Sequence, residues 1–338
     1  MPNKACFKDY RSLMFSGRQA SLRARPCLKY GTNTENFLTC FVGYPAAATS
    51  PFTLIAKLKS KPVCIVYDNE NNIWVSVDTP SSGIYIIKPN NLTPVLWIQG
   101  VLNLPVALCF NATFTELYVV DFGNSIIYQF NVKTKTLINT LSNISLTYLN
   151  GVFPFGPLQL PNGGAMDSTC SNLYVTNTKP GSENVIRINL TTFNVTLVAN
   201  IPFPILICFN SLSDCFFVSS STTNSIYIIT NGGTGTTYPY IVGGELSQPR
   251  GVTVDNACEK LFVTNYNKDG TTNAEINYIS VYNIININSP IFLYNIIGSV
   301  LNKPRGVCFN YNDNNNLLIS NFGSDTIYNC NLPKYNAT

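Results

Sequence analysis

The chain has 338 residues, 11% of them charged, and a net charge of only +4. Histidine is absent, which excludes Ser–His and Cys–His nucleophile systems and zinc sites held by histidine. Residues 1–30 carry seven Lys or Arg and one acid, so the remainder is slightly acidic and lacks the basic stripe that nucleic-acid binding needs. No run of eighteen apolar residues occurs, so no membrane-spanning helix is expected.

The first fifty residues are predicted to form a basic, flexible extension. Residues 11–26 are rich in Arg and Ser and contain no acid, which is typical of a disordered leader and also resembles a transit peptide or a basic docking tail. A secretory signal is not favoured, because the apolar stretch at 37–48 comes late and contains Pro45. We therefore divide the chain into an extension, 1–50, and one folded domain, 51–338.

From residue 62 onward the chain repeats one pattern six times. Each copy begins with a proline, has Asp or Asn six residues later, and continues with a second and a third apolar stretch. The prolines are 43 to 56 residues apart, which is near the period of propeller blades. The prolines are Pro62, Pro105, Pro161, Pro204, Pro249 and Pro304, and the residues six further on are Asp68, Asn111, Asp167, Asn210, Asp255 and Asn310.

Each copy contains three short strand patterns, and the first five copies also contain a looser fourth. The repeat therefore predicts an all-β, six-bladed β-propeller with four-stranded blades. The sixth copy has no fourth strand, because only ten residues follow Tyr328. The strand pattern at 52–58 precedes the first repeat, and we expect it to supply the outer strand of the last blade, since propellers protect their strand edges by closing the ring.

The best-preserved copies, at 249–266 and 304–310, resemble the NHL-type repeat of six-bladed β-propellers. The resemblance covers about residues 52–331 and rests on Pro-x-Gly-Val followed by Leu-Phe-Val-Thr-Asn; the glycine is present as Gly163, Gly251 and Gly306. The Asn- and Ile-rich composition resembles that of proteins from AT-rich genomes, such as those of giant amoebal viruses or protists. This second resemblance implies a virion as one location of the protein.

Cysteine usage favours a reducing, intracellular compartment. The count of 11 is odd and no Cys-x-x-Cys pair occurs, so a complete disulfide framework is excluded. Cys109, Cys208 and Cys308 all stand four residues after a repeat proline, where other copies have Val, Ala or Thr, so we expect small buried side chains. The Asp or Asn at the sixth position is expected to shape the turn that follows the first strand.

Polar residues close the second strand of most copies, and the loops that they open should share a face with Arg250 and Arg305. Loops on a rigid ring are typical binding elements. We expect this face to bind a protein or glycan partner without catalysis and without a cofactor. The residues of this predicted face are Asp78, Asp121, Asn124, Asn177, Asn265, Asn321, Asp325, Arg250 and Arg305.

The fold resemblance implies an alternative function. Six-bladed lactonases and gluconolactonase-like enzymes hold calcium with a ring of Asp and Asn around the central channel, and calcium takes six to eight oxygen ligands. The alternative is therefore a calcium-dependent lactonase- or esterase-like hydrolase, with the metal bound by Asp121, Asn177, Asn265 and Asn321. Against it, those enzymes also use an axial glutamate, and no first-strand position here holds Glu.

Overall fold

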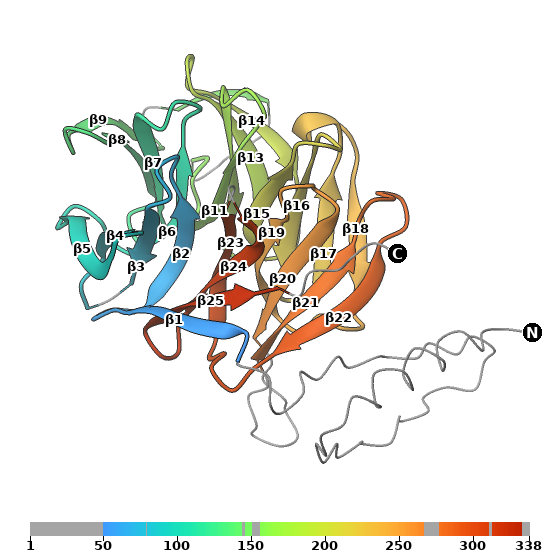
Figure 1. Cartoon of the computed structure of the whole chain (residues 1–338). Coiled ribbons are helices and arrows are strands. Elements are labelled where there is room, and N and C mark those ends of the chain that lie inside the picture. The colour runs from blue at the N-terminus through green and yellow to red at the C-terminus, as the bar shows by residue number, and fades with distance from the viewer. Residues whose placement is uncertain are drawn as a thin grey trace, which may run out of the picture. The chain divides into compact units, whose positions relative to one another are not determined.

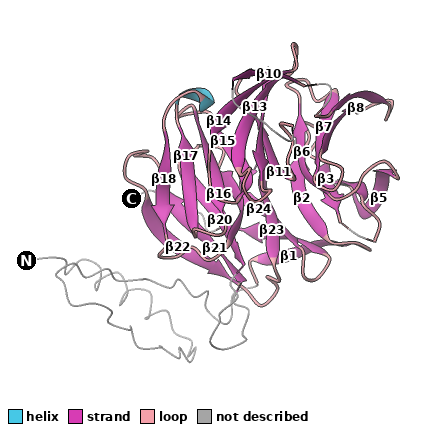
Figure 2. Ribbon diagram, turned by 180° about the vertical axis from the view of Figure 1, so that it is seen from behind, coloured by secondary structure: helices cyan, strands magenta, loops and turns pink. Residues whose placement is uncertain are grey.

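Six sheets surround a common centre (Figures 1 and 2), and the innermost strand of each sheet begins at a repeat proline. The computed structural model describes residues 50–78, 80–143, 146–150, 156–266, 277–310 and 313–332. Within these residues, the strand that starts at each proline packs against the corresponding strand of the next sheet, and the sixth packs back onto the first. The predicted all-β, six-bladed β-propeller is therefore confirmed.

We number the blades in chain order and call the strand that starts at the proline the inner strand. Blade 1 contains β2 (Pro62–Tyr67), β3 (Ile73–Val77), β4 (Gly83–Lys88) and β5 (Asn91–Gln99). Blade 2 contains β6 (Pro105–Phe110), β7 (Glu116–Asp121), β8 (Ile126–Asn131) and β9 (Leu137–Leu141). Blade 3 contains β11 (Pro161–Met166), β12 (Asn172–Asn177), β13 (Asn184–Asn189), β14 (Asn194–Ala199) and the additional strand β10 (Thr147–Asn150).

The other three blades follow the same plan. Blade 4 contains β15 (Pro204–Asn210), β16 (Cys215–Ser220), β17 (Ser225–Ile229) and β18 (Thr237–Val242), with the short 3-10 helix η1 (Asn231–Gly233) before its outer strand. Blade 5 contains β19 (Pro249–Val254), β20 (Lys260–Tyr266), β21 (Asn277–Asn283) and β22 (Ile291–Ile297). Blade 6 contains β23 (Pro304–Asn310), β24 (Asp313–Asn321), β25 (Thr326–Asn331) and β1 (Phe52–Lys57).

Strand β1 closes the ring, as the sequence predicts. It pairs antiparallel with β25, from Phe52 opposite Cys330 to Lys57 opposite Thr326. The N–H of Leu58 then donates to the carbonyl of Asp325 at 2.7 Å, and the side chains of Phe52 and Leu58 are buried. The N-terminal end of the domain thus covers the edge that the last repeat leaves unpaired.

Blade 3 differs from the predicted four strands because β10 adds a fifth. Strand β10 runs parallel to the outer strand β14, with Thr147 opposite Asn194 and Tyr148 opposite Val195. The interval between Pro105 and Pro161 is 56 residues, the longest in the chain, and the extra residues supply this strand. A four-residue strand that pairs in parallel has no periodic pattern of its own, so the repeat did not predict it.

The strand register is irregular at the start of each inner strand. In all six blades the pairing between the inner and second strands shifts register one to three residues after the proline. The residue before the proline has a positive φ in five blades, which is uncommon outside glycine. This shift of register therefore turns the first side chains of the inner strand toward the centre of the ring. The positive-φ residues are Leu104, Leu160, Phe203, Gln248 and Lys303.

In blades 1 to 5 the repeated Asp or Asn six residues after the proline shapes a turn, as predicted, whereas residues 311–312, which follow Asn310, lie outside the described residues. The side-chain oxygen of Asp68 accepts the N–H groups of Glu70 and Asn72, both at 2.9 Å. Asn111, Asp167, Asn210 and Asp255 accept backbone N–H groups of their own turns in the same way. These residues are therefore structural parts of the turn between the inner and second strands.

The described cysteines are all free thiols. Cys109 is buried, whereas Cys208 and Cys308 are partly buried, and burial raises the pKa of all three. These three residues pack with apolar side chains of the blade cores, so they act as small core residues. Cys6, Cys27 and Cys40 lie outside the described residues, as does nearly all of the predicted extension 1–50.

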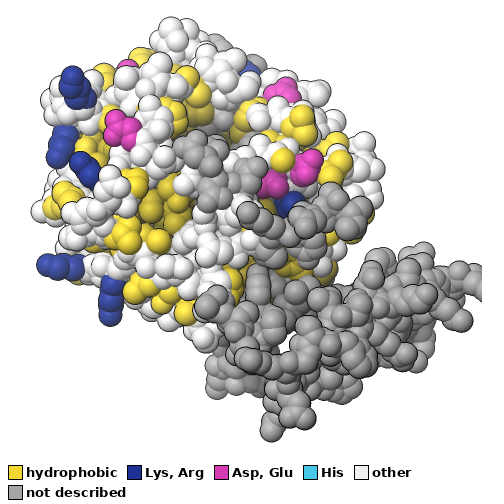
Figure 3. All heavy atoms as spheres, viewed as in Figure 1, with side chains coloured by type: hydrophobic (Ala, Val, Ile, Leu, Met, Phe, Trp, Pro, Cys, Tyr) yellow, Lys and Arg dark blue, Asp and Glu magenta, His cyan; other side chains and the backbone are white. Residues whose placement is uncertain are grey.

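The outer strands carry apolar side chains at the surface. Val95, Leu137, Val242 and Ile291 are each at least 48% exposed, and Figure 3 shows apolar side chains between polar ones with few charges on the face in view. Single exposed apolar residues are normal in soluble folds. No described helix is long and apolar enough to cross a membrane.

Candidate functional site

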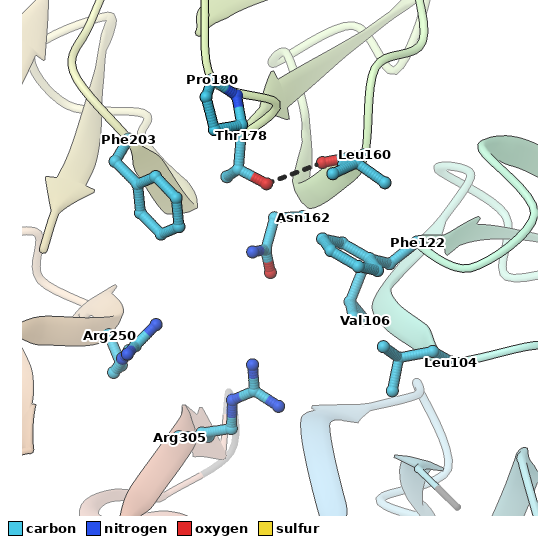
Figure 4. A pocket seen from close by; sticks show the side chains of 10 residues that line it. All are labelled: Leu104, Val106, Phe122, Leu160, Asn162, Thr178, Pro180, Phe203, Arg250 and Arg305. Atoms are coloured by element: carbon cyan, nitrogen blue, oxygen red, sulfur yellow. Dashed lines mark hydrogen bonds between the residues drawn. The ribbon is translucent and has the colours of Figure 1, made fainter.

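A cavity of about 260 Å³ lies where the inner strands of five blades begin. Arg250 and Arg305 direct their guanidinium groups into it, and the amide of Asn162 lies between them and the opposite wall (Figure 4). Among the described residues, no acidic side chain lines this cavity. Its lining consists of Leu104, Val106, Phe122, Leu160, Asn162, Thr178, Pro180, Phe203, Arg250 and Arg305.

The cavity follows from the irregular start of the inner strands. Val106, Asn162, Arg250 and Arg305 each stand one residue after a repeat proline. Leu104, Leu160 and Phe203 each stand one residue before it, with a positive φ. The irregular strand start thus places one or both neighbours of the proline beside the cavity in blades 2 to 6, on the face that also carries the loops after the second strands.

The two arginines form a partly buried pair of like charges. Both side chains are half-buried, and within the described residues neither forms an ion pair. Burial and the charge of Arg250 lower the pKa of Arg305 to about 10, while Asp78 acts in the opposite direction. Burial also lowers the pKa of Arg250. Both groups stay protonated at neutral pH, so the mouth of the channel concentrates positive charge in a partly desolvated place.

Aromatic rings hold the basic side chains on this face. The guanidinium carbon Cζ of Arg305 lies 4.7 Å from the ring centre of Phe322, and Lys61 Nζ lies 5.0 Å from the same ring. Lys303 Nζ lies 5.3 Å from the ring centre of Tyr266. Cation–π contacts of this kind orient a cation without neutralising it. The positive charge of Arg305 therefore remains available to an incoming anion.

Buried hydroxyl groups fix the backbone that carries the arginines. The residue fifteen positions after the repeat proline is Ser219 in blade 4 and Thr264 in blade 5. Ser219 Oγ donates to the carbonyl of Arg250 at 2.6 Å, and Thr264 Oγ1 donates to that of Arg305 at 3.1 Å. Each hydroxyl also accepts a backbone N–H of the inner strand of its own blade. Thr176 and Ser320 link blades 3 to 4 and 6 to 1 in the same way.

Close packing between blades explains the glycine of the repeat. A Cβ atom at Gly251 would lie 2.1 Å from the carbonyl oxygen of Arg305, and one at Gly306 would lie 2.7 Å from that of Val63. Neither contact is tolerable, so only glycine allows the neighbouring inner strand to approach this closely. The same glycines thus help to place Arg305 beside the channel.

The four residues predicted as a metal ring occupy equivalent positions but bond within their own blades. Each is the last or the penultimate residue of a second strand, is fully buried, and accepts the N–H of the residue two before the repeat proline. The pairs are Asp121 with Asn103, Asn177 with Gln159, Asn265 with Ser247 and Asn321 with Asn302, at N···O distances of 2.7, 2.9, 2.9 and 3.2 Å. Each side chain therefore ties its strand to the loop that leads into the inner strand.

Blade 4 reverses this bond for a chemical reason. Its equivalent acceptor position is Ser220, and the residue two before the proline is Pro202, which has no N–H. The hydroxyl of Ser220 instead donates to the carbonyl of Pro202. The contact is thus preserved with exchanged donor and acceptor, which supports its structural role.

The remaining predicted residues lie at separate places on the same face. Asp78 follows β3 and its N–H donates to the carbonyl of Lys61 at 2.9 Å. Asn124 is exposed, and its amide donates to the carbonyl of Val101 at 3.2 Å. Asp325 has a positive φ, and its carbonyl receives the N–H of Leu58. Of the predicted set, Arg250 and Arg305 are the two that line the cavity.

The donors present do not fit a calcium ion. The oxygens of the four ring residues already accept backbone N–H groups, and two guanidinium groups stand at the channel mouth. Among the described residues, no group of three or more acidic or Cys side chains could hold a metal. We derive no step through calcium, and its binding stays a prediction from the sequence.

Burial gives Asp121 a pH-dependent effect on stability. Burial raises its pKa from 3.8 to about 6, although the N–H groups of Asn103, Asn124 and Gly123 act in the opposite direction. The folded state therefore binds more protons than the unfolded state between about pH 4 and pH 6, and stability falls as pH rises through this window. We expect Asp121→Asn to remove this loss, worth about 1–3 kcal/mol at pH 7.5.

Urea unfolding at pH 4.5 and pH 7.5 measures this effect. Asn177→Asp is the reciprocal control, because it places a second carboxylate where the amide now donates to the carbonyl of Pro157. This variant should lose stability as pH rises, more steeply than the native chain. An unchanged pH slope in Asp121→Asn would contradict the assignment.

The ring is similar to solved structures at low sequence identity. A protein named as a candidate gluconolactonase gives a TM-score of 0.63 at 12% identity, over 85% of this chain and 93% of that chain. A Bacteroides thetaiotaomicron protein of unknown function gives 0.61 at 14% identity, over 81% and 70%. A chain of the nidogen–laminin complex gives 0.56 at 14% identity, over 71% and 81%. At these identities the likeness establishes the β-propeller fold alone.

No protein-family model matches the chain, and no curated protein matches it. The class that the fold defines is thus the six-bladed β-propeller. The NHL-type resemblance, the intracellular location and the viral or protist origin stay predictions from the sequence.

Proposed function

We propose that the protein is a non-catalytic binding module that holds a partner protein on the face where its inner strands begin. The observation that carries this proposal is the convergence of Arg250 and Arg305, from adjacent blades, on one cavity to which the described part of the chain contributes no acid. Two like charges in a partly desolvated place gain most from an anion supplied by a partner. The rigid ring presents them without any movement of the scaffold.

The lining favours a protein over a glycan. Six of the ten lining residues are apolar, and they form most of the wall that the arginines leave (Figure 4). Apolar walls suit an apolar side chain and leave sugar hydroxyl groups without partners. The likeness to a chain of the nidogen–laminin complex supports the use of this fold in protein association. The NHL-type pattern remains our proposal for the kind of repeat.

The described lining of the cavity also offers no groups typical of a hydrolase. None of its lining residues carries a carboxylate, imidazole or thiol that could act as a general base. A calcium-dependent hydrolase would need both a base and an ion at this place. The lining therefore supports binding over catalysis.

Affinity capture from lysate of the source organism, followed by quantitative mass spectrometry, tests the proposed function. The baits are the native chain, the double variant Arg250→Gln/Arg305→Gln and the control Lys303→Gln, which removes a cation of the same face outside the cavity lining. We expect at least one protein to be retained by the native chain and by Lys303→Gln, and to be reduced about tenfold or more with the double variant.

Two results would contradict the proposal. One is a set of captured proteins that does not depend on the two arginines. The other is capture that disappears after the lysate is treated with glycosidases, which would make the partner a glycan. Equal unfolding midpoints of the three baits are required for either comparison.

A further inference from the structure

We propose that the cavity binds a carboxylate carried by a small apolar group, and that this group is the C-terminal residue of the partner polypeptide. The inference rests on the proposed function and names the chemistry of its anchor. It is carried by the lining of the cavity, in which two arginines from neighbouring blades lie together and apolar side chains, from Phe203 beside Arg250 round to Leu104, occupy most of the remaining lining (Figure 4).

The charged side fits a carboxylate. Guanidinium groups bind carboxylates through two parallel hydrogen bonds, and the side chains of Arg250 and Arg305 reach the cavity from neighbouring blades. The amide of Asn162 faces the same space and can donate to a second oxygen. The hydroxyl of Thr178, by contrast, already donates to the carbonyl of Leu160 at 2.9 Å.

The apolar side fits the group that carries the carboxylate. Phe122, Phe203 and Pro180 are joined there by three aliphatic side chains, so a ligand atom on this side loses its water. A phosphate would bring three strongly hydrated oxygens against this wall, whereas a carboxylate has two oxygens and leaves its carbon chain to the wall. The lining therefore favours an apolar carboxylate over a phosphate.

The size of the cavity favours the end of a longer ligand. Pockets that enclose a whole small molecule usually have volumes of roughly 300–1,000 Å³. At about 260 Å³, this cavity suits the terminal residue of a chain whose remainder lies on the surrounding loops. A C-terminal residue with an aliphatic or aromatic side chain supplies both the carboxylate and the apolar group.

Isothermal titration calorimetry of the full chain with small probes tests this inference. The probes are N-acetyl-leucine, a pentapeptide that ends in leucine with a free carboxylate, and the C-terminal amide of each. Inorganic phosphate and glucuronate serve as an anion without an apolar group and as a polar carboxylate. We expect both free carboxylates to bind, the peptide at least as tightly as N-acetyl-leucine, and every other probe to bind at least about tenfold more weakly.

Variants assign the binding to the cavity. Arg305→Gln should weaken the binding of the pentapeptide at least about tenfold, Arg250→Gln should act in the same direction, and Lys303→Gln should leave it unchanged within about twofold. Arg250→Gln provides the reading if Arg305→Gln does not fold. Phe203→Ala should weaken the peptide acid while phosphate stays weak, because it removes part of the apolar wall.

Each outcome decides the inference separately from the proposed function. Equal affinity for acid and amide probes, or binding that persists in both arginine variants, would overturn the carboxylate site. Binding of N-acetyl-leucine without binding of the pentapeptide would make the ligand a small acid and overturn the terminal residue. Arginine-dependent capture of a protein without probe binding would leave the proposed function standing and remove this inference.

Discussion

Deletion of residues 50–60 is expected to destabilise the whole ring, whereas deletion of residues 1–30 should hardly change the unfolding midpoint. The first deletion removes β1, exposes the edge of β25 and takes Phe52 and Leu58 out of the core. The loss of these contacts amounts to about 5 kcal/mol or more, a large part of the stability of a typical domain. Thermal unfolding followed by circular dichroism should therefore show a midpoint lower by about 10 °C or more.

Single substitutions in the same strand provide a matched control. The ring of Phe52 packs edge-on against Tyr328 and fills the space beside Gly298, so Phe52→Ala should cost about 3–5 kcal/mol. The side chain of Leu54 is 50% exposed, and Leu54→Ala should change stability by no more than about 0.5 kcal/mol. Equal effects of the two deletions, or of the two substitutions, would mean that β1 does not close the ring.

The sequence predicted the ring because the residues that define the strand register recur at fixed positions in each copy. A proline opens each inner strand, and the Asp or Asn six residues later closes the turn that follows, so each copy could be aligned without gaps over its first seven residues. The closing strand was predictable as well, since the last copy lacked an outer strand. Strand β10 was not, because a short segment that pairs in parallel leaves no period in the sequence.

The candidate site was predictable only in part. The pattern identified the strand ends at Asp121 and Asn177 but not the direction of their side chains, which is decided by bonds to the loops of their own blades. It named Arg250 and Arg305 but missed the apolar wall, for example Phe203. The signal that could have found the wall is position, because seven of the ten lining residues stand directly before or after a repeat proline. The direction of these side chains depends on the irregular start of the inner strand, and the residue types do not predict that irregularity.

The hydroxyl groups between the blades are expected to affect both stability and binding. Thr264 is fully buried. Its hydroxyl accepts the N–H of Gly251 at 2.7 Å and donates to the carbonyl of Arg305 at 3.1 Å. The hydroxyl oxygen of Thr264 therefore links two blades and fixes the backbone position from which Arg305 reaches the cavity. A change at this position should affect the fold and the site together.

We expect Thr264→Val to lower the free energy of unfolding by about 2–4 kcal/mol, because it leaves two buried backbone groups without a partner. The ring should still form, since blade 2 has Val120 at the equivalent position. The affinity for the pentapeptide acid should fall as well, because the carbonyl of Arg305 loses the hydrogen bond that fixes the backbone of this arginine. Urea unfolding and calorimetry measure the two effects on the same sample.

Thr253→Val is the matched control for this substitution. Thr253 is partly buried and stands four residues after its proline, where blade 1 has Val66, and its hydroxyl makes one weak contact at 3.5 Å with the carbonyl of Val254. Its stability should change by no more than about 0.5 kcal/mol. If Thr264→Val lost stability but kept full affinity, the hydroxyl would support the blades without positioning Arg305. If both properties were unchanged, the bonds between the blades would contribute to neither.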